Sequence, residues 1–526
     1  MTTATTTEPL QPAAPAATGA RVYSHREVLI VFSGLMLGML LAALDQTVVA
    51  TALPTIVGQL GGLDHLAWVV TAYLLTSTAS TPLYGKIGDL YGRKRTFQSA
   101  IIIFLAGSLL SGAAQNMWQL IGSRAIQGLG AGGLMSLAMA IIGDLVPPRD
   151  RGRYQGYNGA VFAFASVAGP LLGGFFVDHL TWRWVFFINL PIGTAALVMS
   201  SLVLRETERR LERKVDYVGS ALLIAGVTTL LLITTWGGSQ YAWTSPVILM
   251  MSVLVVSLLG LFVWWEGRQA EPILPPRLFR SNVISLCNIS NVFLGVALFG
   301  AIVYLPLFLQ LVTGASATSS GLLTMPLTIG LIGMSIVCGR VISSTGRYKA
   351  FPIVGLAISV VGMFLLSTLT SSSNQLAATL YMVILGVGMG MVMPVLITAI
   401  QNAVSLSDLG TATASSQFFR SMGSALGVAV FGSILNNRLA YYLPKFLPLG
   451  AVGASTGSVL QGSPAQILAL PAPVRHAIVE AFSHSLHVVF LSAIPVLLAG
   501  LLAMLFLEEV PLRKSLEYHA TAEAVV

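Results

Sequence analysis

The sequence predicts an all-α protein that crosses a membrane many times, and three observations support this prediction. First, 55% of the 526 residues are hydrophobic and only 9% are charged, whereas about a quarter of the residues in a soluble globular domain are charged. Second, long apolar segments recur along the whole chain, and about 20 apolar residues are enough to span a bilayer. Third, motifs of the first part of the chain return in the same order in the second part. The chain is therefore predicted to be a multi-pass integral membrane protein.

Hydropathy along the chain predicts about fourteen membrane spans. Residues 1–27 are rich in Thr, Ala and Pro, so we expect a disordered tail there and not a cleaved signal. A first six-helix bundle is predicted over 28–204, two inserted spans over 205–283, a second six-helix bundle over 284–507 and a tail over 508–526. The second bundle includes an external loop over 436–485, rich in Gly, Pro and Ser in its first part. The expected spans are 28–52, 66–85, 97–114, 117–144, 156–177, 184–204, 217–236, 246–265, 284–311, 318–338, 351–370, 375–397, 413–435 and 486–507.

The positions of the cations orient these spans. With the N-terminus inside, most of the 28 Lys and Arg residues fall into loops and tails on the cytoplasmic side, Lys94, Arg151 and Arg210 among them. This distribution follows the positive-inside rule and places both termini in the cytoplasm. It also argues that the net charge of +8 reflects membrane topology and not a nucleic-acid-binding patch.

A repeat relates the two predicted bundles. One offset carries Gly128, Gly130 and Gly132 onto Gly386, Gly388 and Gly390, and a slightly shorter one carries Gly85, Gly92 and Arg93 onto Gly339, Gly346 and Arg347. Because each repeat holds an even number of spans, both bundles are expected to have the same topology in the membrane. Substrate sites of such parallel repeats lie between the halves near the middle of the membrane.

Asp45 lies inside the first predicted span and Arg124 inside the fourth. A charged group at membrane depth is costly and usually marks an ion or substrate pathway. Both residues fall in the outer half of the membrane, so we expect them to pair or to communicate through water. The alternative is that each is only a buried structural polar group. The functional interpretation predicts a transporter.

Two glycine-containing motifs accompany this pair. The turn Gly85–Arg95 joins the second and third spans, and its Asp89 is able to pair with an arginine or to cap a neighbouring helix; the alternative is a loop whose cations only orient the chain. In the fifth span, Gly169, Pro170, Gly173 and Gly174 predict a bend with close helix packing. Here the alternative is small-residue packing without a function.

Together these motifs resemble those of the fourteen-span drug:proton antiporter family of the major facilitator superfamily, of which the phrase Trp182–Pro191 is also typical. The resemblance implies a major facilitator fold and export of lipophilic compounds driven by inward proton flow. The site residues it implies are Asp45 and Arg124 for proton coupling, Gly85, Asp89, Gly92 and Arg93 for a cytoplasmic gate, and Gly169, Pro170, Gly173 and Gly174 for an antiporter hinge. The chain departs from the family at Leu90, Ala165 and Ser343, and Ser343 stands where the second gate copy would have its aspartate.

The predicted function is a proton-coupled secondary antiporter that exports lipophilic, neutral or monocationic compounds by alternating access. It is expected to act as a monomer in a bacterial cytoplasmic membrane, without cofactor, metal or nucleic acid. The chain has no phosphate-binding Gly-Lys-Ser/Thr loop, so ATP is not expected to drive it. The alternatives are a dedicated exporter of one metabolite, antibiotic, lipid or siderophore, a membrane enzyme, and a non-transporting sensor or scaffold. Scattered histidines disfavour the enzyme, and the charged pair within a repeat disfavours the scaffold.

Overall fold

The computed structural model describes residues 25–60, 66–146, 148–204, 216–238, 240–269, 272–315, 319, 322–370, 373, 375–405, 408–447 and 471–512. These residues form α-helices joined by short connections, with one 3-10 helix, η2 (Pro276–Arg280). No strand occurs among them apart from an isolated bridge between Gly237 and Tyr241. The all-α prediction is confirmed.

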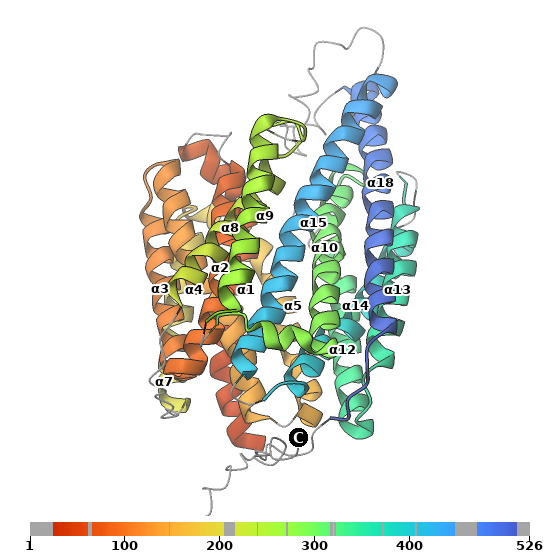
Figure 1. The fold of residues 1–526 in the computed structure, drawn as a ribbon. Coiled ribbons are helices and arrows are strands. Elements are labelled where there is room, and N and C mark those ends of the chain that lie inside the picture. The colour runs from red at the N-terminus through yellow and green to blue at the C-terminus, as the bar shows by residue number, and fades with distance from the viewer. Residues whose placement is uncertain are drawn as a thin grey trace, which may run out of the picture.

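The helices fall into two bundles and an inserted pair (Figure 1). The first bundle comprises α1 (His25–Leu60), α2 (Leu66–Tyr91), α3 (Arg93–Ala113), α4 (Met117–Leu145), α5 (Pro148–His179), and α6 (Trp184–Phe187) followed by α7 (Asn189–Val203). The inserted pair is α8 (Tyr217–Trp236) and α9 (Pro246–Glu266). The second bundle comprises α10 (Asn282–Leu311), α12 (Met325–Thr345), α13 (Ala350–Ser367), α14 (Gln375–Asn402), α15 (Leu409–Phe446) and α18 (Ala472–Leu505). We call the end of the molecule at which α1 begins and α18 ends the terminal face.

Within the described part of the chain, 13 helical segments are long and apolar enough to cross a membrane. The predicted span at 66–85 corresponds to α2, which is 26 residues long but is not one of the 13. Its sequence explains the low hydropathy, because α2 contains several hydroxyl side chains and carries Lys86 and Asp89 near its end. The hydroxyls of Thr76 and Thr81 donate to backbone carbonyls one turn earlier, which satisfies them inside a membrane helix.

The structure places several boundaries differently from the sequence prediction. Helix α1 already begins at His25, inside the predicted tail over 1–27, and continues to Leu60, beyond the predicted span 28–52. Helix α12 begins at Met325 and ends at Thr345, several residues later than the predicted span 318–338. The segment 436–485 is helical at both ends, because α15 continues to Phe446 and α18 already begins at Ala472. Polar side chains in these stretches lower the hydropathy without interrupting the helix. The middle of the predicted loop, 448–470, lies outside the described residues.

The two bundles repeat the same packing. In the first, α2 and α3 both pack on α4, and α1 packs on α5; in the second, α12 and α13 pack on α14, and α10 packs on α15. The repeated glycines make these contacts: Gly128 and Gly132 face α2 and Gly130 faces α3, while Gly386 and Gly390 face α12 and Gly388 faces α13. The missing side chains allow the backbones to approach closely, as small residues do between membrane helices.

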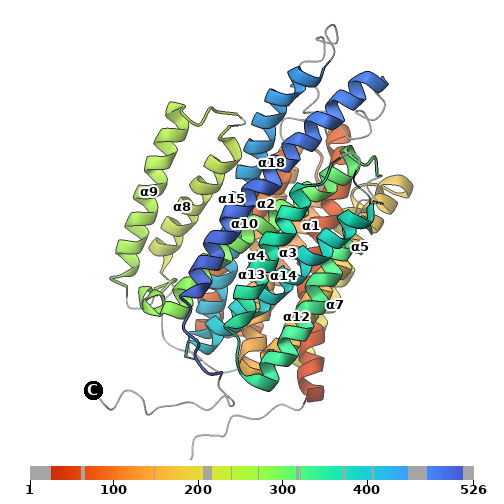
Figure 2. The same cartoon turned by 90° about the vertical axis from the view of Figure 1, so that its right-hand side faces the viewer.

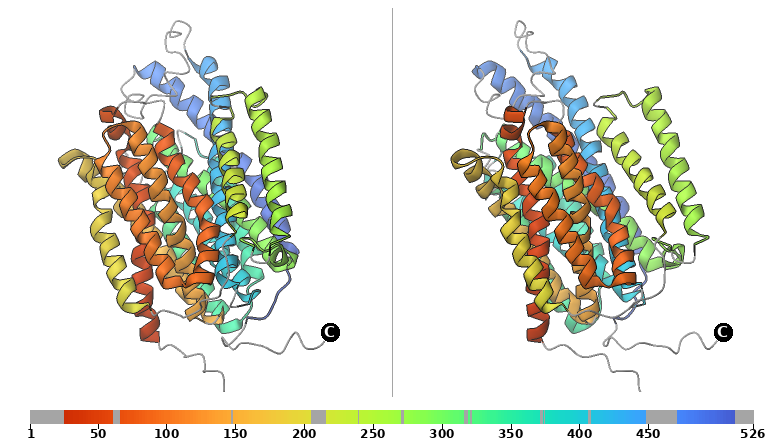
Figure 3. Two further views of the ribbon diagram at one scale, coloured as in Figure 1. Left: turned by 60° about the vertical axis from the view of Figure 1, so that its left-hand side comes forward. Right: turned by 90° about the vertical axis from the view of Figure 1, so that its left-hand side faces the viewer.

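In the described part of the chain the bundles meet mainly where α5 packs on α12 and α2 on α15, with smaller contacts of α4 with α15 and of α5 with α14. The inserted pair α8–α9 stands to one side of both bundles, as Figures 2 and 3 show. Helix α8 contacts α2 of one bundle and α15 of the other, through an apolar cluster that includes Leu223, Leu83 and Phe418. The inserted helices therefore cover the seam at which α2 meets α15.

Candidate functional site

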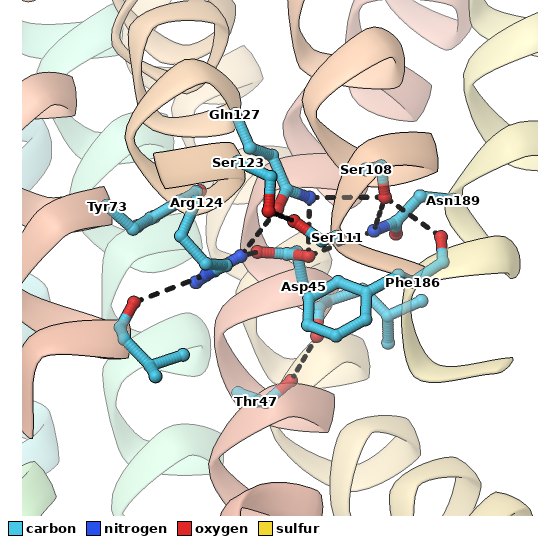
Figure 4. A network of polar contacts seen from close by, with 12 residues as sticks. Asp45, Thr47, Tyr73, Ser108, Ser111, Ser123, Arg124, Gln127, Phe186 and Asn189 are labelled. Carbon is cyan, nitrogen blue, oxygen red and sulfur yellow. Dashed lines mark hydrogen bonds and ion pairs between the residues drawn. The ribbon is translucent and has the colours of Figure 1, made fainter. Parts of the chain in front are cut away.

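Asp45 and Arg124 form an ion pair inside the first bundle (Figure 4). Arg124 Nη1 of α4 donates to Asp45 Oδ2 of α1 at 2.5 Å. Asp45 is 0% exposed and Arg124 is 1% exposed. The expected pairing is therefore present, and neither charge is left uncompensated in the membrane interior, where an isolated charge would be costly.

Two further side chains donate hydrogen bonds to the carboxylate of Asp45. Gln127 Nε2 donates to Asp45 Oδ1 at 2.8 Å, and Asn189 Nδ2 of α7 donates to the same oxygen at 2.9 Å. Asn189 also donates to Ser108 of α3, and Gln127 Oε1 accepts from Arg124 at 2.7 Å. Asp45 thus receives donors from α4 and α7, and each described partner of its two oxygens is a donor.

Aromatic rings close this network from two sides. The Arg124 guanidinium lies over the ring of Tyr73 of α2, 4.2 Å from its centroid, and 5.9 Å from that of Phe186 of α6. Such contacts favour a cation over an aromatic face. The pair is consequently enclosed in this conformation, without direct contact with solvent.

Sequence reasoning gave no role to these other residues of the network, namely Gln127, Asn189, Ser108 and Tyr73. One signal was available for Gln127, because it lies three residues after Arg124 and so shares its helix face. No signal in the sequence connected Asn189 or Ser108 to Asp45, because they belong to distant helices.

The second group of predicted site residues meets at the terminal face. Asp89, near the end of α2, binds Arg93 of α3 at 2.8 Å, and Arg93 also pairs with Asp144 of α4. Asp89 Oδ2 accepts from the backbone N–H and the hydroxyl of Thr411, at 2.8 and 2.9 Å. Thr411 lies in the first turn of α15, whose N-terminus attracts a carboxylate through the helix dipole. We call the contacts among Asp89, Arg93, Asp144 and Thr411 the latch, because they tie the two bundles together.

The glycines around the latch are required by space or by backbone conformation. A Cβ at Gly85 would collide with Ala414 of α15, and one at Gly410 would collide with Asp89 and Arg93. Gly92 has φ 95° between α2 and α3, and Gly346 has φ 73° after α12, a region in which glycine is favoured. Gly85, Asp89, Gly92 and Arg93 are therefore brought together as one unit.

The predicted hinge residues lie on α5, which packs on α1. A Cβ at Gly169 would collide with Thr47, whose hydroxyl donates to the Ala165 carbonyl at 2.9 Å. Gly173 is buried, but a Cβ at Gly174 would meet nothing within 4 Å, so Gly174 makes no close contact. The Pro170 side chain lies outside the described part of the structure. Close packing of α5 on α1 therefore depends on Gly169. The residue it packs against, Thr47, lies two positions after Asp45 on α1.

The described ranges contain no cluster of side chains suited to bind a metal ion. No three His, Cys, Asp or Glu side chains come together there as metal ligands would.

Solved structures share this arrangement of helices. A human organic anion transporter, MFSD10 (TETRAN), superimposes with a TM-score of 0.60 at 16% identity, covering 89% of this chain and 99% of its own. The proton:xylose symporter XylE gives a TM-score of 0.61 at 16% identity, covering 92% and 96%. At this identity the similarity establishes the fold alone.

Proteins found by sequence similarity share a higher identity with this chain than these solved structures do. An uncharacterised MFS-type transporter of Mycobacterium tuberculosis is 43% identical over 92% of this chain and 70% of its own length. The multidrug transporter protein MdtP of Bacillus subtilis is 39% identical over 93% and 94%, and multidrug resistance protein 3 of the same organism is 36% identical over 89% and 93%. The family model of the Major Facilitator Superfamily matches residues 35–428. The chain belongs to the major facilitator superfamily of membrane transporters.

Proposed function

We propose that this transporter is a proton-coupled antiporter that exports lipophilic compounds by alternating access. The protein is a multi-pass transporter and not an enzyme, and relatives at 36–39% identity are named as multidrug proteins. We further propose that it acts as a monomer in a bacterial cytoplasmic membrane and that its terminal face is cytoplasmic, in agreement with the positive-inside rule.

The single observation that carries the proposal is the enclosed Asp45–Arg124 pair. Asp45 is the titratable carboxylate of this pair, and all its described partners are donors. When Asp45 takes up a proton, its charge disappears, and Arg124 loses its counter-charge. Asn189 Oδ1 is buried without a partner in the described residues, so rotation of this amide would supply an acceptor for the new O–H group. Protonation would therefore rearrange contacts among α1, α4 and α7.

In the proposed alternating-access cycle, opening of the latch is the step that accompanies protonation or deprotonation of Asp45. Asp89 joins α2 to α15 at the terminal face, so this conformation has the bundles tied together on the side we propose to be cytoplasmic. Opening towards the cytoplasm requires the Asp89–Thr411 contacts to break. Helix α1 connects the two events, because Asp45 and Thr47 lie one turn or less apart and Thr47 is packed against α5, which in turn crosses to α12.

Substrate charge follows from the same network. The sequence predicted neutral or monocationic substrates. Asp45 already pairs with Arg124 and is 0% exposed, so it offers no free carboxylate to a cation in this conformation. A single cation would therefore have to compete with Arg124 and with the proton for Asp45, whereas a compound without positive charge does not need this carboxylate.

Purified protein in liposomes tests the proposal. A panel of lipophilic compounds is loaded, and their flux is recorded with an imposed pH gradient, without a gradient, and with the gradient reversed. We expect compound and protons to move in opposite directions, with flux falling when the gradient is collapsed. Compound movement that is independent of the gradient would refute proton coupling, and movement of compound and protons in the same direction would refute antiport.

A further inference from the structure

A second arginine, Arg420, lies within the membrane span Leu409–Phe446 of α15. Its Nη2 donates to Gln417 Oε1 one turn earlier, and its side chain is partly exposed. No carboxylate in the described ranges forms an ion pair with it, whereas Arg124 is neutralised by Asp45. Because a charge at membrane depth is costly without a counter-charge, Arg420 requires a different explanation.

Most sides of α15 around Arg420 are covered by other helices. One side packs on α10, a second on α2 and a third on α8, and α18 packs on α15 as well. The residues of α15 that make these contacts are Gly423 and Gly427 towards α10, Ala414 towards α2, and Phe418 in the apolar cluster with α8.

The side of α15 between its contacts with α10 and α2 is polar, and its backbone at Arg420 and Ser424 borders Gly295 of α10. Thr413, Gln417, Arg420 and Ser424 follow one another at helical spacing, so they share one face of the helix. At its terminal end this face meets Gln401 of α14, whose Nε2 donates to Thr413 Oγ1 at 3.0 Å and to the Met139 carbonyl of α4 at 3.3 Å. Arg420 therefore lies on the face of α15 directed between the two bundles, where substrates of parallel-repeat transporters bind.

The chemistry of this face selects a ligand. A guanidinium has five N–H donors in a planar fork, and Gln417 occupies only one nitrogen of Arg420. The remaining donors match the two oxygens of a carboxylate, which arginine binds in a bidentate manner. We infer that Arg420, oriented by Gln417, binds the anionic group of lipophilic compounds that carry one negative charge.

This inference rests on the proposed export of lipophilic compounds and names a substrate class for it. It does not depend on proton coupling, because Arg420 belongs to the second bundle and Asp45 to the first. A single arginine also sets the limit at one charge, since a second anionic group would remain without a partner at the same depth.

Equilibrium binding to the purified full-length protein at pH 7, without any gradient, tests this inference. The probes are radiolabelled biphenyl-4-carboxylate and the uncharged biphenyl-4-carboxamide, which have nearly the same shape. We expect the wild type to prefer the carboxylate. Loss of a charge-assisted hydrogen bond predicts that Arg420→Gln weakens carboxylate binding at least about tenfold, leaves the amide within about twofold and removes the preference, while Arg420→Lys retains part of it.

The matched control is Arg438→Gln, which removes an exposed arginine of the same helix and should leave both affinities unchanged. Gel filtration and thermal unfolding of each variant report whether it is folded. Equal binding or no binding of the two probes by the wild type would refute the inference, as would an equal loss of both in folded Arg420→Gln protein. Proton-driven flux of the amide is measured separately, so failure of the proposed antiport would be recognised independently.

Discussion

Replacing Asp45 with asparagine removes the titrating group while keeping its shape, and the structure shows what else changes. Asparagine still offers one oxygen to Arg124, but its NH2 group faces the Nε2 of Gln127 and the Nδ2 of Asn189. The new NH2 group is a donor that faces two other donors, so these hydrogen bonds are lost. Arg124 also keeps its charge without a counter-charge. We therefore expect Asp45→Asn to abolish proton-driven flux and also to lower stability.

The size of the stability loss follows from the burial of the pair. Removing one partner of a buried ion pair costs about 3–5 kcal/mol, and the retained oxygen places Asp45→Asn near the lower end, at about 3 kcal/mol. Because a unit of about 200 residues loses 2–4 °C per kcal/mol, the melting temperature should fall by about 6–12 °C. In the double variant Asp45→Asn/Arg124→Gln no charge is buried, so most of this loss should be recovered while flux remains absent.

Thermal unfolding in detergent and flux in liposomes at several external pH values separate the two effects. Wild-type flux by Asp45→Asn across this pH range would exclude Asp45 as the coupling group. A double variant that is less stable than Asp45→Asn would show that the buried charge of Arg124 is not the source of the instability.

The other predictions concern the latch, the hinge and the amide beside Asp45, and each uses flux normalised to membrane protein. Asp89→Ala should reduce flux at least about tenfold through loss of charge-assisted bonds and more than Ser343→Ala does; equal effects would contradict the asymmetry between the two copies. Gly169→Ala should impair flux because its Cβ has no space, whereas Gly174→Ala should be tolerated; equal sensitivity would mean that close packing is not what the hinge requires. Asn189→Ala removes the side chain that links Asp45 to Ser108 and to α7, so proton-driven flux should fall; wild-type flux would exclude Asn189 from the coupling network.

The helices and the repeat could be predicted from the sequence because the bilayer imposes simple constraints. Backbone groups inside lipid must be satisfied within the segment, so long apolar stretches become helices. The glycine pattern was equally readable, because Gly128 and Gly386 perform the same packing task against α2 and α12. Charged residues at membrane depth such as Asp45 are rare enough to stand out, and so their pairing could be expected.

The remainder of the site depends on how helices pack, which local sequence does not specify. Ser108 and Asn189 are ordinary polar residues until α3 and α7 bring them to Asp45. Thr411 likewise gains its role only because α15 begins next to Asp89. The inserted pair α8–α9 could be found by hydropathy, but its place over the seam depends on apolar contacts with both bundles.

The two aspartates differ in what they connect, and this difference suggests how they divide the work. Asp45 contacts only the first bundle, so its protonation cannot by itself open or close either face. Asp89 contacts both bundles but is held by Arg93 on its own side and by Thr411 on the other, so breaking its link to Thr411 leaves the carboxylate paired. The latch is therefore able to open without creating an isolated charge. Under the proposed proton coupling, a proton at Asp45 would have to act on the latch indirectly, and the contact of Thr47 with α5 would provide a route through packing alone.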